Sequence, residues 1–171
     1  MQISICYHIS GSRASFKAEK YHYKNMQKEV LLDILSQNRI TCSAAFDEIT
    51  FDNATLRLNG KTASAGFILR HLGETINMFG LFFGVPSSVQ NTTMGQSDTG
   101  QGEDVEESKR LIEQGYEMLR KLVEDTPDSA WLDSIDTPFF GTVSRAKLFS
   151  HILFHNSHHA GQIILTLKKG D

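Results

Sequence analysis

The chain has 171 residues, which is enough for one domain with a sizeable hydrophobic core. With 40% hydrophobic residues, 22% charged residues and a formal net charge of −3, it has a globular composition and no broad basic surface for nucleic acid. The two cysteines, Cys6 and Cys42, have neither metal-binding nor redox spacing, which favours a reducing, cytoplasmic location over a disulfide framework.

Residues 1–24 are predicted to form an N-terminal extension without a regular pattern. Ser10, Gly11, Ser12 and Ser15 interrupt any helical period, and the segment lacks the architecture of a signal peptide. No later segment approaches the roughly 20 apolar residues of a membrane span. Residues 25–171 are therefore predicted to form one domain that does not enter a membrane.

Four stretches of this domain have apolar residues at three- and four-residue steps, the period of an amphipathic helix. Ser64 is a suitable N-cap for the second stretch, the acidic start of the third suits the helix dipole, and Gly170 ends the fourth. The four predicted helices span about residues 25–48, 64–83, 103–124 and 142–168.

Two long connections join these helices. Residues 84–102 are rich in Ser, Thr, Gln and Gly, and residues 125–141 contain Pro127, Pro138 and Gly141. Loops of this length in a compact domain are often functional or disordered. The chain is therefore predicted to be an all-α, antiparallel four-helix bundle with long connecting loops.

Four of the seven histidines lie within nine residues, in His151-Ile-Leu-Phe-His155-Asn-Ser-His158-His159. At about 100° per residue, these side chains and Gln162 occupy a sector of roughly 100° on one helix face. Imidazoles among apolar side chains are costly to bury without partners, and several neutral imidazoles can share one metal ion. The pattern therefore predicts a metal site on this face.

His155 and His159 are four residues apart, so both can reach one ion. The third ligand must come from another helix, and His71 is the candidate because it lies on the apolar side of the second predicted helix. Each part also has a simpler interpretation: His71 could be a hydrogen-bonded core histidine, and the pair could be a surface feature. Together they favour a site made of His71, His155 and His159.

Three neutral histidines leave a divalent ion with an open coordination position, which is typical of a catalytic site rather than a closed structural one. One divalent metal ion is therefore the predicted cofactor. Zinc is the first choice because of its availability, and nickel, iron, cobalt and copper also accept imidazole ligands. The zinc-protease motif H-E-x-x-H is absent, since Leu-Gly-Glu follows His71.

Other residues near the histidines are candidates for catalysis or support. Glu74 could orient a ligand, act as a base or be a solvated carboxylate, and His158 is the other candidate base. His151 and Gln162 could support a ligand, line the pocket or serve packing. Gly161 has low helix propensity inside the last helix, and the close approach of another helix is its predicted cause.

These motifs resemble the DinB-like (DinB/YfiT-like) superfamily of four-helix-bundle metalloproteins. The resemblance rests on Phe67-Ile-Leu-Arg-His71-Leu-Gly-Glu74 and on His155-Asn-Ser-His158-His159-Ala-Gly-Gln162, and covers about residues 26–169. It implies a three-histidine metal site at one end of the bundle, often in a homodimer. It also implies kinship with transferases and isomerases that use low-molecular-weight thiols such as bacillithiol or mycothiol. Ala160 departs from the arginine that many members carry there.

Three hypotheses of function remain open. In a thiol S-transferase, the metal would deprotonate a thiol, the thiolate would attack an electrophile, and residues 84–102 would line the pocket. A metal-dependent hydrolase would use the same ligands with Glu74 or His158 as the base. A non-catalytic binding or interaction protein would keep the metal as a structural element. Histidine phosphotransfer ranks below these, because the histidines cluster beside apolar residues.

A small-molecule substrate is the predicted partner. The resemblance implies that this substrate is a low-molecular-weight thiol and that the chain forms a homodimer. Nucleic acid and membranes are not expected as partners.

Overall fold

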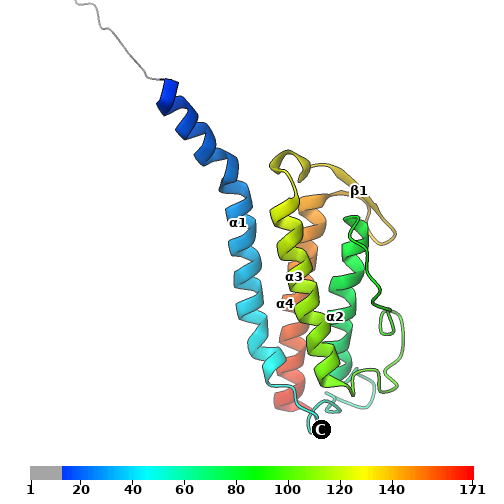
Figure 1. Cartoon of the computed structure of the whole chain (residues 1–171). Helices are drawn as coiled ribbons and strands as arrows, with labels where there is room; N and C mark the ends of the chain where they lie inside the picture. Colours follow the sequence, from blue (N-terminus) through cyan, green and yellow to red (C-terminus); the bar gives the residue numbers. More distant parts are fainter. Residues whose placement is uncertain (1–12) are drawn as a thin grey trace, which may run out of the picture.

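The computed structural model describes the backbone of residues 13–171 and the side chains of residues 26–171. The predicted four-helix bundle is confirmed, and a small two-stranded sheet is added to it at one end (Figure 1). The elements are α1 (Arg13–Asp47), α2 (Ala65–Phe82), α3 (Val105–Asp125), a short 3-10 turn (Asp128–Ala130), β1 (Ser134–Thr137), β2 (Gly141–Ser144) and α4 (Arg145–Lys169).

Helix α1 begins at Arg13 and not near residue 25, where the helical period first becomes regular. Its first turns extend past the ends of the neighbouring helices (Figure 1), so an apolar stripe facing the bundle is not required there. The proposed division into an extension of residues 1–24 and a domain of residues 25–171 stays a prediction. Within residues 13–171, none of the helices combines the length and the apolar composition that a membrane crossing requires.

The starts of the other three helices are set by N-cap side chains, which satisfy backbone N–H groups that have no partner inside the helix. The hydroxyl of Ser64 accepts the N–H of Phe67 at 3.2 Å at the start of α2. Asp104 does the same for α3, and Ser144 for α4. The predicted start of α2 at Ser64 is therefore confirmed, and α4 begins at Arg145, close to the start predicted near residue 142.

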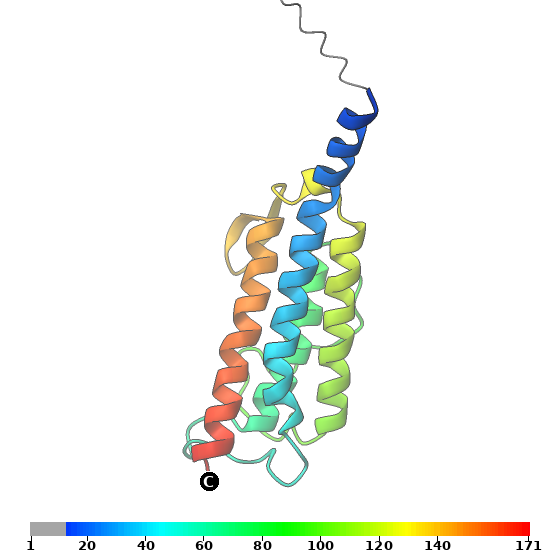
Figure 2. The same cartoon turned by 90° about the vertical axis from the view of Figure 1, so that its left-hand side faces the viewer.

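The helices run in two parallel pairs. Along α2 and α3, the approaches Gly73 to Leu111 and Gly80 to Met118 rise together in sequence, so these two helices are parallel. Helices α1 and α4 form the other parallel pair (Figure 1), in which the Asn38 side chain of α1 donates to the Leu153 carbonyl of α4. Each helix of one pair is antiparallel to those of the other, and Figure 2 shows α1 flanked by α4 and α3 with α2 behind.

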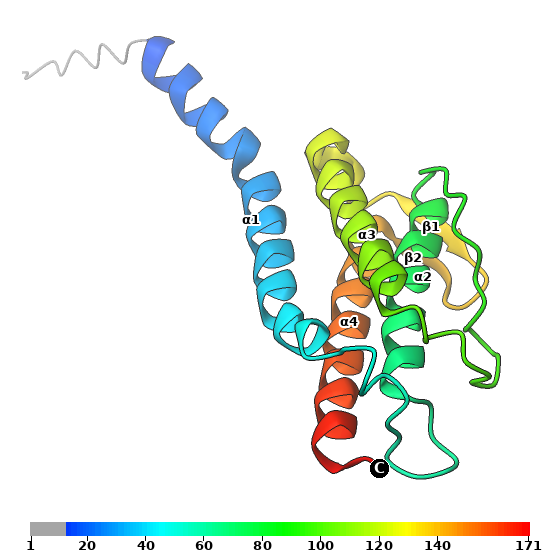
Figure 3. The same cartoon turned by 60° about the horizontal axis from the view of Figure 1, so that its bottom comes forward.

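This arrangement explains the long connection between α2 and α3. Because the two helices are parallel, the chain must return along the whole bundle before α3 can begin. Residues 83–104 make this crossover along the outside of α2 (Figures 1 and 3). Asp98 fixes it to the start of α2 by accepting the Ser64 N–H at 2.8 Å and by pairing with Arg57.

The second long connection, between α3 and α4, contains a small β-hairpin. β1 and β2 pair antiparallel with Ile135 opposite Val143, and both side chains face the core. Gly141 adopts a φ of 63° where the turn enters β2, a conformation that favours glycine. Beside the hairpin, Trp131 is 1% exposed and packs edge-on against Phe149 of α4, with ring centroids 5.5 Å apart. The core therefore continues from the helices to this end of the bundle.

Close helix approach depends on glycines of α2 and α3. A Cβ atom at Gly73 would lie 2.7 Å from Cβ of Leu111, and one at Gly115 would overlap the Ile76 side chain. The approach predicted at Gly161 is wrong: a Cβ there would meet nothing within 4 Å, and the residue lies on the exposed side of α4.

We expect Gly73→Ala and Gly161→Ala to shift stability in opposite directions. The first forces α2 and α3 apart and should lower the free energy of unfolding by about 1–3 kcal/mol. The second improves helix propensity without a clash and should raise it by about 0.5–1 kcal/mol. Urea unfolding of both variants beside the wild type measures the difference. Equal effects of the two would contradict the packing described.

Candidate metal centre

Three histidines from two antiparallel helices meet between α2 and α4. Nε2 of His155 lies 3.2 Å from Nε2 of His71 and 3.1 Å from Nε2 of His159. The ring centroids of His71 and His159 are 5.0 Å apart. The three side chains, each half-buried, thus form a group whose ligand atoms all lie within 4.8 Å of one another. The structure brings together the three residues that were predicted as ligands.

His71 is oriented by the crossover. Thr93 Oγ1 donates to Oε2 of Glu74 at 2.8 Å, so the same oxygen can only accept from Nδ1 of His71, 3.2 Å away. Thr75 Oγ1 makes a longer contact of 3.4 Å with the same nitrogen. A proton on Nδ1 leaves the Nε2 lone pair of His71 directed at the other two histidines. Partners of this kind fix the tautomer of metal-ligating histidines.

The two histidines of α4 differ in their support. Oε1 of Gln162 accepts from Nδ1 of His159 at 2.6 Å, which leaves the His159 Nε2 as an acceptor or ligand. Gln162 therefore supports a site histidine, one of the roles considered for it. Nδ1 of His155 is buried and has no hydrogen-bond partner among the described residues.

The protonation states of these rings suit metal binding. Burial and the neighbouring histidines lower the pKa of His155 to about 3. Burial, followed by the proximity of His71, lowers the pKa of His159 to about 4, and burial also lowers the pKa of His71. All three rings are therefore neutral near pH 7, the form in which imidazole binds metals.

The geometry of the three nitrogens fits one small divalent ion. Ligands about 2.0–2.1 Å from an ion at angles near 90–110° lie about 2.8–3.4 Å from one another. Two of the three nitrogen separations, those of His155 Nε2 from His159 Nε2 at 3.1 Å and from His71 Nε2 at 3.2 Å, fall in this range. Three lone pairs at these distances repel unless a proton or a cation lies between them. The group therefore fits a divalent ion, as a set of nitrogen ligands without a carboxylate.

Glu74 lies behind His71 and does not face solvent. Both carboxylate oxygens are engaged, by Arg70 at 2.7 Å and by the hydroxyls of Thr92 at 2.7 Å and Thr93 at 2.8 Å. Burial alone would raise the pKa of Glu74, but these hydrogen bonds outweigh it and hold the pKa below its ordinary value. Of the roles considered for Glu74, this geometry supports orientation of a ligand, whereas action as a base stays a prediction.

The two remaining histidines of α4 lie outside the group. His158 is exposed, and its ring stacks on Phe154 with a centroid distance of 6.4 Å. His151 packs against Phe140 of the hairpin, 4.4 Å between centroids, and edge-on against Phe79. A catalytic role of His158 stays a prediction, and His151 belongs to an aromatic cluster above the site.

A cavity of about 400 Å³ opens beside the three histidines. His71 and His159 form part of its wall, so an ion held by the group would border it. Thr93 lines it as well, which agrees with the prediction that residues 84–102 contribute to a pocket. The complete lining is Leu58, Thr62, Ala63, Phe67, Ile68, His71, Thr93, His159, Gln162 and Thr166.

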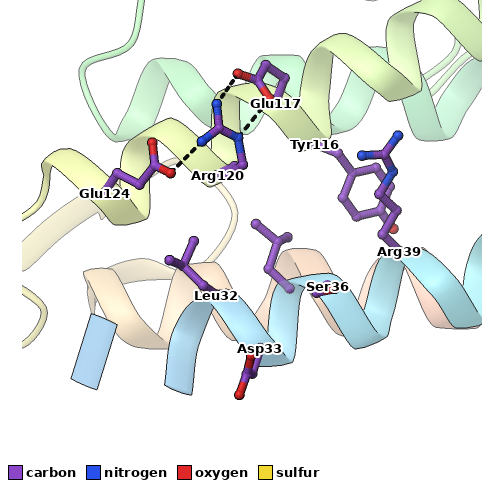
Figure 4. Close-up of a pocket in the computed structure, with 9 residues that line it drawn as sticks. Leu32, Asp33, Ser36, Arg39, Tyr116, Glu117, Arg120 and Glu124 are labelled. Atoms are coloured by element: carbon purple, nitrogen blue, oxygen red, sulfur yellow. Dashed lines mark hydrogen bonds and ion pairs between the residues drawn. The ribbon is translucent and has the colours of Figure 1, made fainter. Parts of the chain in front are cut away.

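A second hollow, of about 330 Å³, lies between α1 and α3 (Figure 4). More of its lining side chains are charged, but all of these except Asp33 are paired. Arg120 pairs with Glu117 and with Glu124 of its own helix, and Arg39 pairs with Glu113. The histidine group lines the first cavity and not this hollow, which makes the first cavity the candidate functional site.

The sequence pattern did not identify Thr93, although it contacts both His71 and Glu74. Its neighbours Asn91 and Thr92 are equally polar, and no periodicity marks a residue in a crossover. The available signal was the length of the connection after the helix that contains His71, which indicated a segment with a role.

Comparison with known proteins agrees with this geometry. The family model of the DinB superfamily matches residues 34–163, which include all three histidines. The chain belongs to the DinB superfamily.

A solved structure has a similar fold. A conserved protein from Enterococcus faecalis superposes with a TM-score of 0.63 at 10% sequence identity, over 82% of this chain and 95% of that one. At this identity the likeness shows the fold alone. No functionally curated protein matches the chain, so neither the reaction nor the metal follows from a relative.

Metal analysis of purified protein should separate the three site histidines from their neighbours. We expect about one zinc or nickel ion per chain in the wild type, and almost none in His155→Ala after dialysis, because two ligands hold an ion far less tightly than three. His158→Ala is the matched control from the same helix and should retain the ion. Plasma mass spectrometry measures the content, and equal content in both variants would contradict the assignment.

Thr93→Val should weaken zinc binding by roughly 10- to 100-fold, because it removes the acceptor that orients His71. Thr93→Ser restores the hydroxyl and should recover most of the affinity. Competition with a zinc-binding dye gives the affinity, and ¹⁵N-edited NMR of the His71 ring reports whether the Nδ1–H form persists. Unchanged affinity and ring signals in the valine variant would mean that Thr93 serves packing alone.

Proposed function

We propose that this DinB-superfamily protein is a divalent-metal-dependent enzyme, and specifically a transferase that joins a low-molecular-weight thiol to an organic electrophile. The observation that carries the proposal is the convergence of three neutral histidines, two of which line a cavity. A site that is closed by a fourth protein ligand would favour a structural ion. Here, among the residues whose side chains the structure describes, the ligand group contains only the three histidines.

The chemistry of a bound divalent ion would be Lewis acidity, which lowers the pKa of a thiol or of water. The residues of the chain have the complementary tasks. Thr93 and Gln162 hold His71 and His159 in the tautomers that leave Nε2 free. The apolar cavity wall excludes water from the same region and holds the electrophile close to the histidines.

Thiol transfer requires less of the protein than hydrolysis does. A thiolate is itself a strong nucleophile once its proton has left, whereas water normally needs a positioned base as well. The carboxylate of Glu74 is buried and fully hydrogen-bonded, and His158 is exposed beside Phe154. We therefore place the transferase before the hydrolase. Zinc as the ion, a homodimer and a cytoplasmic location are parts of the same proposal.

Thiol conjugation should depend on both the ion and His155. Zinc- or nickel-loaded protein is incubated with bacillithiol, mycothiol or cysteine and a chromogenic electrophile, and the rate is compared with that of chelator-treated protein and of His155→Ala. We expect both treatments to reduce the rate to the uncatalysed background, and His158→Ala to retain it.

The other outcomes of this experiment are equally informative. Full activity in metal-free protein would overturn the proposal. Turnover of ester or amide panels in the absence of thiol would favour the hydrolase. If no panel turns over and metal removal only lowers the melting temperature, the ion has a structural role in a binding protein.

A further inference from the structure

The surface of the cavity beside the histidines is mainly apolar, although only four of its lining side chains are apolar. Leu58 and Ala63 come from the connection before α2, and Phe67 and Ile68 come from its first two turns. Phe67 and Ile68 are each 8% exposed and belong to the core, whereas Leu58 and Ala63 are half-buried. Apart from the two site histidines, every lining residue is uncharged.

Two guanidinium groups close to this cavity are already paired. Arg57 binds Asp98 at 2.8 Å and donates to the carbonyl of Thr62 at 2.6 Å. Arg70 is held by Glu74 at 2.7 Å. Neither guanidinium lines the cavity, and each has a carboxylate that neutralises its charge. An anionic ligand group would therefore find no lysine or arginine among the residues that line the cavity.

The start of α2, which also lies at the cavity, cannot bind an anion either. Helix N-termini attract anions through unpaired N–H groups. Here the N–H of Ala65 donates to Leu56, that of Gly66 donates to Ala54, and that of Phe67 donates to the Ser64 hydroxyl. The backbone N–H groups at the N-terminus of α2 are thus already hydrogen-bonded within the protein.

We propose that this cavity binds the uncharged, apolar part of a small organic substrate, with the polar reacting group of that substrate facing His71 and His159. The inference rests on the proposed function, since it takes the three histidines to hold a metal ion. It assigns the cavity to the electrophile, or to the acyl part of a hydrolysed substrate, and not to a carboxylate-bearing group.

A series of alkyl hydroxamates tests the assignment on the zinc-loaded protein. The hydroxamate group binds zinc, and its tail reports on the cavity. From acetohydroxamate to hexanohydroxamate, we expect the affinity measured by calorimetry to rise by roughly fourfold per added methylene until the cavity is filled. A tail of the same length that ends in a carboxylate should bind about tenfold or more weakly than the neutral tail, because its charge would be buried without a partner.

Two variants locate the effect in the cavity. Ala63→Leu fills the space and should abolish the gain from longer tails while acetohydroxamate still binds, whereas Ala44→Leu on the exposed side of α1 is the matched control. Leu58→Lys adds a cation to the wall and should reverse the preference in favour of the carboxylate tail. Circular dichroism verifies that each variant folds. If Leu58→Lys does not fold, the affinities of Ala63→Leu alone test the proposal.

This experiment distinguishes a failure of the cavity assignment from a failure of the proposed function. If acetohydroxamate binds zinc-loaded protein but tail length and charge have no effect, the cavity assignment is overturned and the metal site survives. If the carboxylate tail binds more tightly than the neutral one in the wild type, the ligand class is wrong. If zinc itself does not bind, the proposed function fails first.

Discussion

The buried carboxylate of Glu74 is the constraint on which the surroundings of the histidine group depend. An ionised carboxylate inside a helix bundle is stable only when its oxygens are hydrogen-bonded or paired. Glu74 satisfies this requirement with Arg70 from its own helix and with Thr92 and Thr93 from the crossover. These contacts fasten the crossover to α2 and bring the Thr93 hydroxyl to His71. One buried charge thus fixes both the path of a loop and the orientation of a candidate metal ligand.

The direction of the helices makes that contact feasible. Because α2 is antiparallel to α4, His71 faces the pair His155 and His159 across the interface. Because α2 is parallel to α3, the chain must return along the outside of α2 (Figure 3), and this return brings Thr93 to His71. A tight turn between two antiparallel helices would have placed no backbone there. The topology therefore supplies the segment that supports the site, and the close glycine contacts at Gly73 and Gly115 let the parallel pair pack tightly enough to hold it.

How much of the structure the sequence predicts depends on how far apart along the chain the interacting residues lie. The helices, the cap at Ser64 and the spacing of His155 and His159 are local, and they were predictable from periodicity and propensity. The pairing of these two histidines with His71 needed one further assumption, that polar groups on apolar faces meet. The parallel direction of α2 and α3, the contact of Thr93 and the open surroundings of Gly161 depend on packing between distant segments, which no local pattern encodes.

Charge balance connects the site with its cavity. Three neutral imidazoles would leave the double charge of a divalent ion without compensation from its ligands. Glu74 would compensate part of it through Thr93 and His71, but Arg70 pairs with the same carboxylate and would reduce that effect. The residues that line the cavity carry no lysine, arginine or carboxylate. The remaining compensation would then come from the reacting group of a ligand, so the proposed site would favour an anion such as a thiolate at the histidines and a neutral tail in the adjoining cavity. This division of charge between two neighbouring spaces is consistent with the proposed reaction between a thiol and an apolar electrophile.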